Sequence, residues 1–400
     1  MHQYKRQLRP VDSLFSVFRA VAYRLPLTLL NWVVQRFFRA EKHRWIFMNQ
    51  NRELTGNLLY LFEHVRQHEP SVSAKLMLFD KSLAEKLVRR YGQETAMYAW
   101  SWDALQAFFG SGVVVIAYGM VANAFFPYVL SRRTKLVVNL WHGVPLKRVG
   151  YQARHSFERQ RHWERQHYSK MVASSKFEQL AFAACFQMNI DDIWISGVPR
   201  NDPLCQPARP LAAELPAGAK VILYAPTWRD GAEDAKLFPF EGVDLAYLNA
   251  WLGERSAVLL VRFHYIERAA TFESLGNIIH DDGARFGEVQ QILANTAVLI
   301  TDYSSIYFDY LLLDRPIVFI PYDAVEYEMR RGFMLPYDWA TPGPKVKTWD
   351  EFLVALDRAL DNPDHDEPRR KEVRDFTHAH ADGKASQRIC SEIRGELEGR

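Results

Sequence analysis

The sequence predicts an α/β protein with two Rossmann-like, doubly wound halves that face each other across a cleft. Short, uniformly apolar runs typical of buried parallel strands recur along the chain, and helical stretches alternate with them. The chain has 400 residues, too many for one ordinary core. A stretch rich in proline and alanine, 203–220, lies between two sets of strands and is typical of an interdomain linker.

The first set of strands precedes this stretch. Helical spacing follows the first strand over 51–67, where Leu54, Leu58 and Val65 share one apolar face, and a second helix is expected over 83–91. The strands of this half are expected at 44–49, 75–79, 113–117, 136–140, 171–174 and 192–196.

The second set follows the linker, and the end of the chain is mostly helical and charged. Strands are expected at 221–225, 258–263, 277–280, 298–301 and 317–320. We therefore expect four regions: amphipathic helices over 1–43, an N-terminal Rossmann-like domain over 44–205, a C-terminal Rossmann-like domain over 206–349 and a helical tail over 350–400.

Composition excludes several classes of protein. A net charge of +3 is too small to indicate a nucleic-acid partner. Three scattered cysteines exclude a disulfide scaffold and a cysteine-based zinc site, and they fit a reducing compartment. The chain contains no glycine-rich nucleotide loop and no zinc-protease motif. Its one D-x-D pair, Asp364 and Asp366, lies in the helical tail, so neither a metal nor a cofactor is expected.

The N-terminal segment has a mixed character. No secretory signal is visible, and the apolar run 25–34 is shorter than the roughly 20 residues that a membrane-spanning helix needs. The wider segment 14–39 combines aromatic and aliphatic residues with arginines. This pattern fits a helix lying in the membrane interface, and it also fits an amphipathic helix packed on its own domain.

Polar clusters follow the predicted strands of both halves. Ligands of open α/β sheets bind at the carboxyl ends of the strands, so we expect these clusters to line one cleft that binds an anion. The clusters are WHGVP after 136–140, GVPRND after 192–196, PTWRD after 221–225, His264 after 258–263 and TDYSS after 298–301.

The residue types in these clusters suit phosphate. Ser304 and Ser305 are expected to open a helix whose N-terminus could bind a phosphate, or to serve only as its caps. Guanidinium groups bind phosphate in a bidentate manner, although each could also form a surface salt bridge. A histidine such as His142 can exchange a proton at cellular pH, or it can be a half-buried loop residue. The arginines concerned are Arg200, Arg229 and Arg262.

The ordered motifs WHGVPLKRVG, GVPRND, YAPTWRD, RFH and ITDYSSIYFDYLLLDRPIVFIPYD resemble the CDP-glycerol:poly(glycerophosphate) glycerophosphotransferase family, over about residues 110–380. The resemblance implies a GT-B fold and transfer of a polyol phosphate from a CDP-activated donor to an acceptor hydroxyl, with release of CMP. It implies His142 as the catalytic base and His264 acting at the phosphates. It also implies a donor site composed of Trp141, Gly143, Val144, Pro145, Arg200, Pro226, Thr227, Arg262, Ser304, Ser305 and Asp309.

One position departs from the family pattern, which has threonine where this chain has Val144. The resemblance implies a CDP-glycerol or CDP-ribitol donor, a lipid-linked or glycan acceptor, and a role in teichoic-acid or capsule synthesis. It also implies peripheral attachment at the cytoplasmic face of the membrane through amphipathic helices, which suits 14–39 and the basic, aromatic run 151–170. That run could equally be a solvated helix.

Two alternatives remain on the sequence alone. A GT-B glycosyltransferase that uses a nucleotide sugar would have the same two-domain cleft, because fold alone does not determine chemistry. A binding or scaffold protein could retain the cleft without activity. The presence of both histidines, the arginines and both serines argues against the second alternative.

Overall fold

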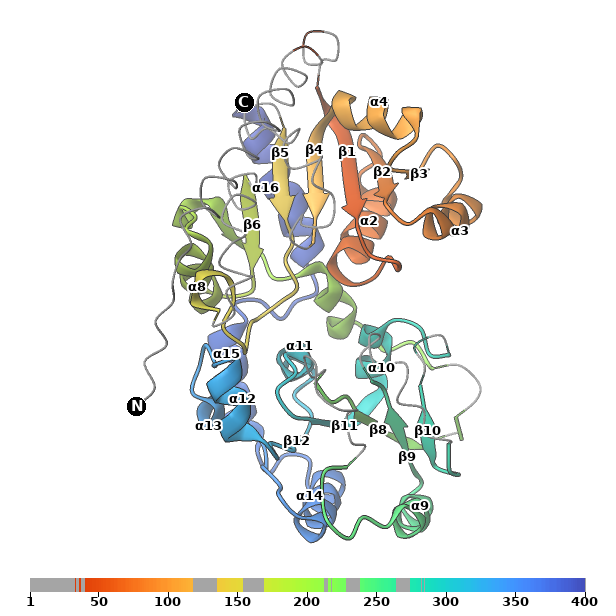
Figure 1. The fold of residues 1–400 in the computed structure, drawn as a ribbon, viewed down its shortest axis with the longest axis vertical. Helices are drawn as coiled ribbons and strands as arrows, with labels where there is room; N and C mark the ends of the chain where they lie inside the picture. The colour runs from red at the N-terminus through yellow and green to blue at the C-terminus, as the bar shows by residue number, and fades with distance from the viewer. Residues whose placement is uncertain are drawn as a thin grey trace, which may run out of the picture.

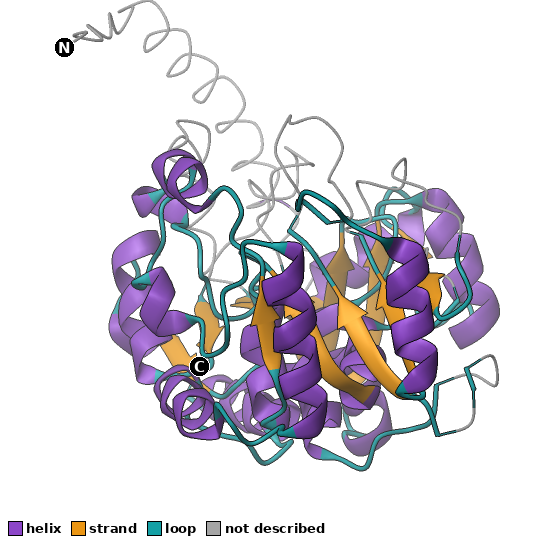
Figure 2. Ribbon diagram, turned by 90° about the horizontal axis from the view of Figure 1, so that it is seen from below, coloured by secondary structure: helices purple, strands orange, loops and turns teal. Residues whose placement is uncertain are grey.

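The computed structural model describes residues 33, 36, 40–117, 135–153, 169–211, 215–216, 218–227, 238–263, 274–281, 283 and 285–399. The structure contains two parallel β-sheets, one in each half of the chain, and they lie in the upper and the lower part of the molecule as drawn in Figure 1. Helices lie in front of and behind the strands (Figure 2). The described part of the chain contains no helix long and apolar enough to cross a membrane.

The first sheet has seven parallel strands in the order β3-β2-β1-β4-β5-β6-β7. The order reverses direction between β1 and β4, as in a Rossmann fold. Its strands are β1 (Glu41–Asn49), β2 (Ser73–Leu78), β3 (Ala96–Tyr98), β4 (Ser111–Ile116), β5 (Leu136–Asn139), β6 (Lys170–Ala173) and β7 (Ile193–Ile195).

Helices cover this sheet because its central strands are buried and apolar on both faces. α2 buries Leu58, Leu61 and Val65 in the core cluster that contains Phe47 and Val138. The described helices of the first half are α2 (Gly56–His68), α3 (Lys81–Tyr91), α4 (Trp102–Gly110) and α8 (Lys176–Phe186), with 3₁₀ turns η1 (Gly150–Gln152), η2 (Ile190–Asp192) and η3 (Pro199–Cys205).

The second sheet repeats the same topology with five strands, in the order β10-β9-β8-β11-β12. Its direction reverses between β8 and β11. The strands are β8 (Lys220–Tyr224), β9 (Ala257–Val261), β10 (Ile278–His280), β11 (Thr296–Thr301) and β12 (Ile317–Phe319). The helices that the structure describes here are α9 (Leu245–Glu254), α10 (Val289–Asn295), α11 (Ile306–Tyr310), α12 (Ala324–Arg330) and α13 (Tyr337–Ala340), with the 3₁₀ turn η5 (Leu311–Leu313).

Three helices end the chain: α14 (Trp349–Asp361), α15 (Glu367–Thr377) and α16 (Ala385–Glu398). α14 packs on the second sheet, whereas α16 returns to the first, where Ile389 and Ile393 are fully buried (Figure 1). The carboxylate of Asp202 in η3 accepts hydrogen bonds from the first two N–H groups of α16, at 2.7 and 2.9 Å. The end of the chain thus completes the core of its beginning.

The predicted α/β class with two sets of parallel strands is confirmed. Each strand expected from an apolar run is present, with ends that differ by a few residues. The sequence reasoning missed β3 and α4, and part of the expected linker is ordered as η3 and as the first residue of β8. The segments 1–32, with most of 33–39, and 154–168 lie outside the described residues.

The turn after β5 also connects the two halves. Its residues Val144 and Leu146 are buried in a core cluster made mostly of residues of the second half. The Leu146 carbonyl accepts a hydrogen bond from Met334 N at 2.8 Å, and Arg148 N donates to the Gly332 carbonyl at 3.1 Å. The WHGVP turn is therefore built against both halves of the molecule.

Candidate functional site

The turn after β5 holds an aromatic pair in a strained backbone. Trp141 has a φ of +50°, which is uncommon outside glycine. Its amide donates to the Asn139 side-chain oxygen at 2.9 Å. Its indole packs against Phe182 and Phe186 of α8, with ring centroids 5.9 and 4.7 Å away. These contacts hold the residue in place, and with it the start of the turn.

His142 stacks on that indole with the ring centroids 4.1 Å apart. Although the residue as a whole is partly exposed, burial of the imidazole, together with the smaller effects of the nearby cations Arg200 and Lys147, lowers the pKa of His142 to about 3. The imidazole is therefore neutral near pH 7 and has a ring nitrogen able to accept a proton.

Gly143 brings the backbone against the guanidinium of Arg200. It has a φ of +91°, and a Cβ at this position would lie 2.5 Å from Arg200 Nη2. The same Cβ would lie 3.7 Å from Asp309 Oδ1. Glycine is required here both by the backbone conformation and by the close approach.

Arg200 lies at the start of η3, after β7, and pairs with a carboxylate of the other half. Its Nη2 lies 2.7 Å from Asp309 Oδ2, and both side chains are largely buried. The second oxygen of Asp309 accepts a hydrogen bond from Asn201 Nδ2 at 3.0 Å. Asp309 therefore orients Arg200, while the buried Arg200 Nε has no hydrogen-bond partner among the described residues.

Asn57, in the first turn of α2, connects two of the strand-end clusters. Its Nδ2 donates to the Leu140 and Trp141 carbonyls at 3.2 and 2.9 Å. Its Oδ1 accepts from Arg200 N at 3.2 Å. One buried amide thus sets the position of the WHG turn relative to Arg200.

In the second half, the loops after β8 and β11 meet at the point where the strand order reverses. Asp302 Oδ1 accepts hydrogen bonds from Thr227 N at 2.8 Å and from Tyr303 N at 2.6 Å. Thr227 is buried, and its hydroxyl has no hydrogen-bond partner within the described part of the chain. Ligands of this fold bind at such a switch point, so Thr227 is well placed to contact one.

The serines of TDYSS precede a short helix, α11. α11 has five residues before the chain tightens into η5. Ser305 is its N-cap but makes no capping hydrogen bond, and Ser304 Oγ accepts only a long one, 3.4 Å, from Ile306 N. Because Asp309 lies in α11, this helix and the WHG turn are brought together through Arg200.

The other predicted site residues lie as follows. Arg262 follows β9, and its Nη1 lies 2.9 Å from Asp281 Oδ2 and 3.0 Å from the Gly287 carbonyl. Pro145 is buried and Pro226 is partly exposed. His264 and Arg229 lie outside the described residues, so their places in the cleft stay predictions.

Sequence reasoning missed Asn57 and Glu178. The only signal for Asn57 was a polar residue on the apolar face of α2. Glu178 lies in α8, fully buried, and accepts a hydrogen bond from Ser174 N. Burial raises the pKa of Glu178 to about 7, against smaller opposing effects of its hydrogen bonds with Ser174 and of the Arg200 charge.

Comparison with known proteins gives a consistent result. The model of the CDP-Glycerol:Poly(glycerophosphate) glycerophosphotransferase family matches residues 30–395. The teichoic acid poly(ribitol-phosphate) polymerase of Bacillus spizizenii is 27% identical over 386 residues, which are 90% of this chain and 57% of that protein. The teichoic acid glycerol-phosphate transferase of Staphylococcus aureus is 30% identical over 279 residues, 63% of this chain and 69% of that protein.

Solved structures show the same fold. The wall teichoic acid polymerase TagF superposes with a TM-score of 0.73 at 22% identity, covering 96% of this chain and 98% of that one. A UDP-N-acetylglucosamine 2-epimerase from Listeria monocytogenes, described as putative, gives a TM-score of 0.57 at 11% identity, with 90% and 98% covered. The chain spans 57%, 48% and 53% of the length of three of the polymerases that it matches.

Proposed function

Because the chain belongs to the CDP-glycerol:poly(glycerophosphate) glycerophosphotransferase family, we propose that it transfers a polyol phosphate from a CDP-activated donor to an acceptor hydroxyl. Glycerol phosphate is the expected group, with ribitol phosphate as the alternative. The product would be a phosphodiester of a teichoic-acid-like or capsular polymer. One observation carries the proposal: a neutral imidazole, His142, lies beside a buried guanidinium that a carboxylate of the other half orients.

The two halves would act as a GT-B pair, with 44–205 receiving the acceptor and 206–349 holding the CDP donor. The loops after β8 and β11 favour the donor assignment, because they meet at a switch point where the buried hydroxyl of Thr227 has no hydrogen-bond partner among the described residues. The terminal helices of 350–400 would complete the two lobes. Attachment of 1–43 to the cytoplasmic face of the membrane remains part of the proposal.

In the proposed reaction the acceptor oxygen attacks the β-phosphorus of the donor, and His142 takes its proton. The bond between that phosphorus and the bridging oxygen breaks, and CMP leaves with the electron pair. Arg200 and Arg262 would stabilise charge on the phosphate oxygens, together with the hydroxyls of Ser304 and Ser305. His264 would act at the leaving phosphate.

We expect His142 to become a stronger base when the donor binds. Burial is the main cause of the low pKa of His142 in the free protein, and the cations Arg200 and Lys147 contribute a smaller part. A bound diphosphate is anionic and offsets those charges, so it raises the pKa of the imidazole towards the range in which general bases work well.

The test is the substitution His142→Ala. Transfer should fall by about 10² to 10⁴, because general-base catalysis typically contributes that factor, while donor binding is largely kept. The measurement is CMP release from CDP-glycerol with and without membrane acceptors, and mass spectrometry of the product. His365→Ala, at an exposed histidine of the C-terminal region, is the matched control.

Near wild-type turnover in the His142→Ala protein would show that His142 is not the general base. A donor panel of CDP-glycerol, CDP-ribitol, UDP-sugars and CMP-sugars identifies the transferred group. Turnover with a nucleotide sugar alone would favour the glycosyltransferase alternative.

A further inference from the structure

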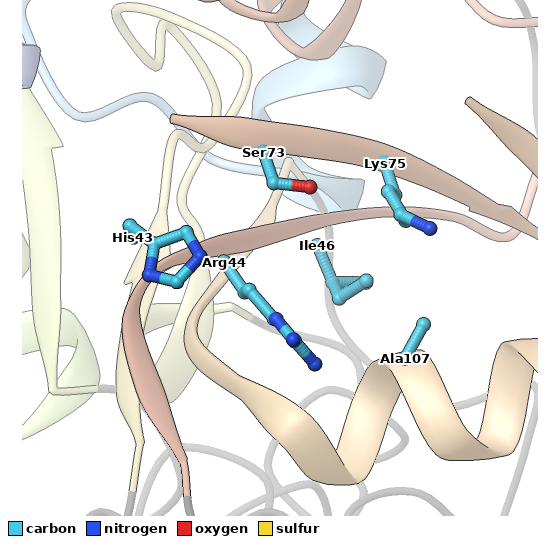
Figure 3. Close-up of a pocket in the computed structure, with 6 residues that line it drawn as sticks. All are labelled: His43, Arg44, Ile46, Ser73, Lys75 and Ala107. Atoms are coloured by element: carbon cyan, nitrogen blue, oxygen red, sulfur yellow. The ribbon is translucent and has the colours of Figure 1, made fainter. Parts of the chain in front are cut away.

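A cavity lies in the first half, away from the turn of His142. It has a volume of about 310 Å³ and is lined by His43, Arg44, Ile46, Ser73, Lys75 and Ala107 (Figure 3). Arg44 and Ser73 are direct neighbours across β1 and β2, and so are Ile46 and Lys75. Paired residues two apart on parallel strands share one face of the sheet, so these four side chains form a single surface.

The cavity lies near the amino ends of its strands. Ser73 is the first residue of β2, and Arg44 is the fourth residue of β1. The WHG turn, by contrast, follows the carboxyl end of β5. A ligand here would occupy the edge of the sheet opposite to the candidate catalytic site.

Basic groups dominate the described residues that line the cavity, and none of these is acidic. One close carboxylate lies outside the lining: Glu41 is 2.9 Å from Arg44 Nη2 and 3.5 Å from His43 Nε2. Lys75 Nζ lies 4.0 Å from the carboxylate of Glu94, which is 99% exposed. Surface ion pairs of this kind are weak, so the Arg44 guanidinium and the Lys75 ammonium can still bind another anion.

The floor of the cavity has a different chemistry from its rim. Ile46 is buried and Ala107 of α4 is apolar, whereas the guanidinium of Arg44 and the ammonium of Lys75 provide charged donors. A water molecule occupies about 30 Å³ in the liquid, so the cavity volume equals that of roughly ten water molecules. A phosphate joined to a three-carbon polyol is of this size, with an anionic end and a carbon chain.

We propose that this cavity binds the phosphate ester of a small polyol as a second anion site, distinct from the donor site. Arg44 binds two phosphate oxygens through its planar guanidinium, Lys75 adds a point charge and the Ser73 hydroxyl donates a hydrogen bond. The ester is either a soluble polyol phosphate or the headgroup of an anionic phospholipid, and both present the same chemistry.

The test compares the double variant Arg44→Gln/Lys75→Gln with wild type in two arms. The first arm titrates sn-glycerol 3-phosphate by calorimetry, and the second measures flotation with phosphatidylglycerol vesicles against phosphatidylcholine vesicles. The control is Lys86→Gln/Arg89→Gln, which removes the same charges from exposed positions of α3. Loss of two charged donors should weaken binding at least about tenfold in one arm, with the control unchanged.

A loss in the first arm assigns a soluble ester, and a loss only with phosphatidylglycerol assigns a lipid headgroup. Equal binding by wild type and the double variant in both arms, or no binding by wild type in either, overturns the proposal. Thermal unfolding of all three proteins shows that each is folded. CMP release tests the proposed transferase activity separately, so failure of one idea is distinguishable from failure of the other.

Discussion

At the residue scale, the candidate site depends on side chains whose neighbours restrict them strongly. Gly143 touches Arg200, Arg200 is held by Asp309, and Asn57 fixes the backbone of both strand-end turns. Each of these groups is held in position by a neighbour, so a small change at one residue is expected to move the others.

The substitution Gly143→Ala, compared with a control glycine, should distinguish the effect of backbone strain from the effect of the contact with Arg200. A side chain at a φ of +91° costs about 1–3 kcal/mol, and the new Cβ would push the Arg200 guanidinium away. We expect kcat/KM for the donor to fall by about 10²-fold, as misplacement of about 1 Å can produce. Gly218→Ala is the control, because its φ is +76° and no atom of the described residues lies within 4 Å of the added Cβ. If both variants lose activity equally, the contact with Arg200 is unimportant.

Glu178 should make the stability of the protein depend on pH. Its pKa is raised from an ordinary value of 4.5 to about 7, so the folded state holds a proton that the unfolded state releases. The resulting stabilisation is fully present below pH 4.5 and is lost as the pH rises towards and past 7. Glu178→Gln should therefore flatten the fall in the free energy of unfolding between these pH values. Urea titrations of wild type, Glu178→Gln and the exposed Glu392→Gln test this, and parallel curves for all three would contradict it.

At the element scale, the helix α16 shows that the charged C-terminal region is part of the folded core. The sequence indicates a helical tail, but the structure shows an amphipathic helix whose apolar face fills the first core. Asp202 caps it from η3, so the GVPRND segment supports both the site and this helix.

Ile393→Ala should destabilise the whole chain. The side chain is fully buried, and such truncations cost about 2–5 kcal/mol through lost burial and a residual cavity. Glu392→Ala, at the adjacent exposed position, should change the free energy of unfolding by no more than about 0.5 kcal/mol. Urea unfolding of the two variants measures the difference. Equal values would show that α16 does not contribute to the core.

At the scale of the whole molecule, the two halves are joined by more than a linker. The WHGVP turn enters the core of the second half, α16 enters the core of the first, and Gly56 N of α2 donates to the carboxylate of Glu288, which precedes α10, at 3.3 Å. The chain therefore crosses between the halves in both directions.

A fragment of residues 1–205 should not fold by itself. Its core lacks Ile389, Ile393 and Leu397 of α16, so the apolar surface that they cover is exposed. We expect no cooperative urea transition by circular dichroism, and a transition on co-expression with residues 206–400. A cooperative transition for the fragment alone would show that α16 is dispensable.

The local sequence pattern determined the positions of the strands, the positions of the strand-end turns and the family of this protein. Apolar runs located the strands, the polar residues after them located the strand-end turns, and the ordered motifs identified the family. Only the tertiary structure decided that Arg200 meets Asp309, that Asn57 binds the WHG turn, that Glu178 is buried and that α16 belongs to the first core. The physical reason is distance along the chain. Strand formation depends on neighbouring residues, whereas these contacts join positions that the sequence separates widely and that only packing brings together.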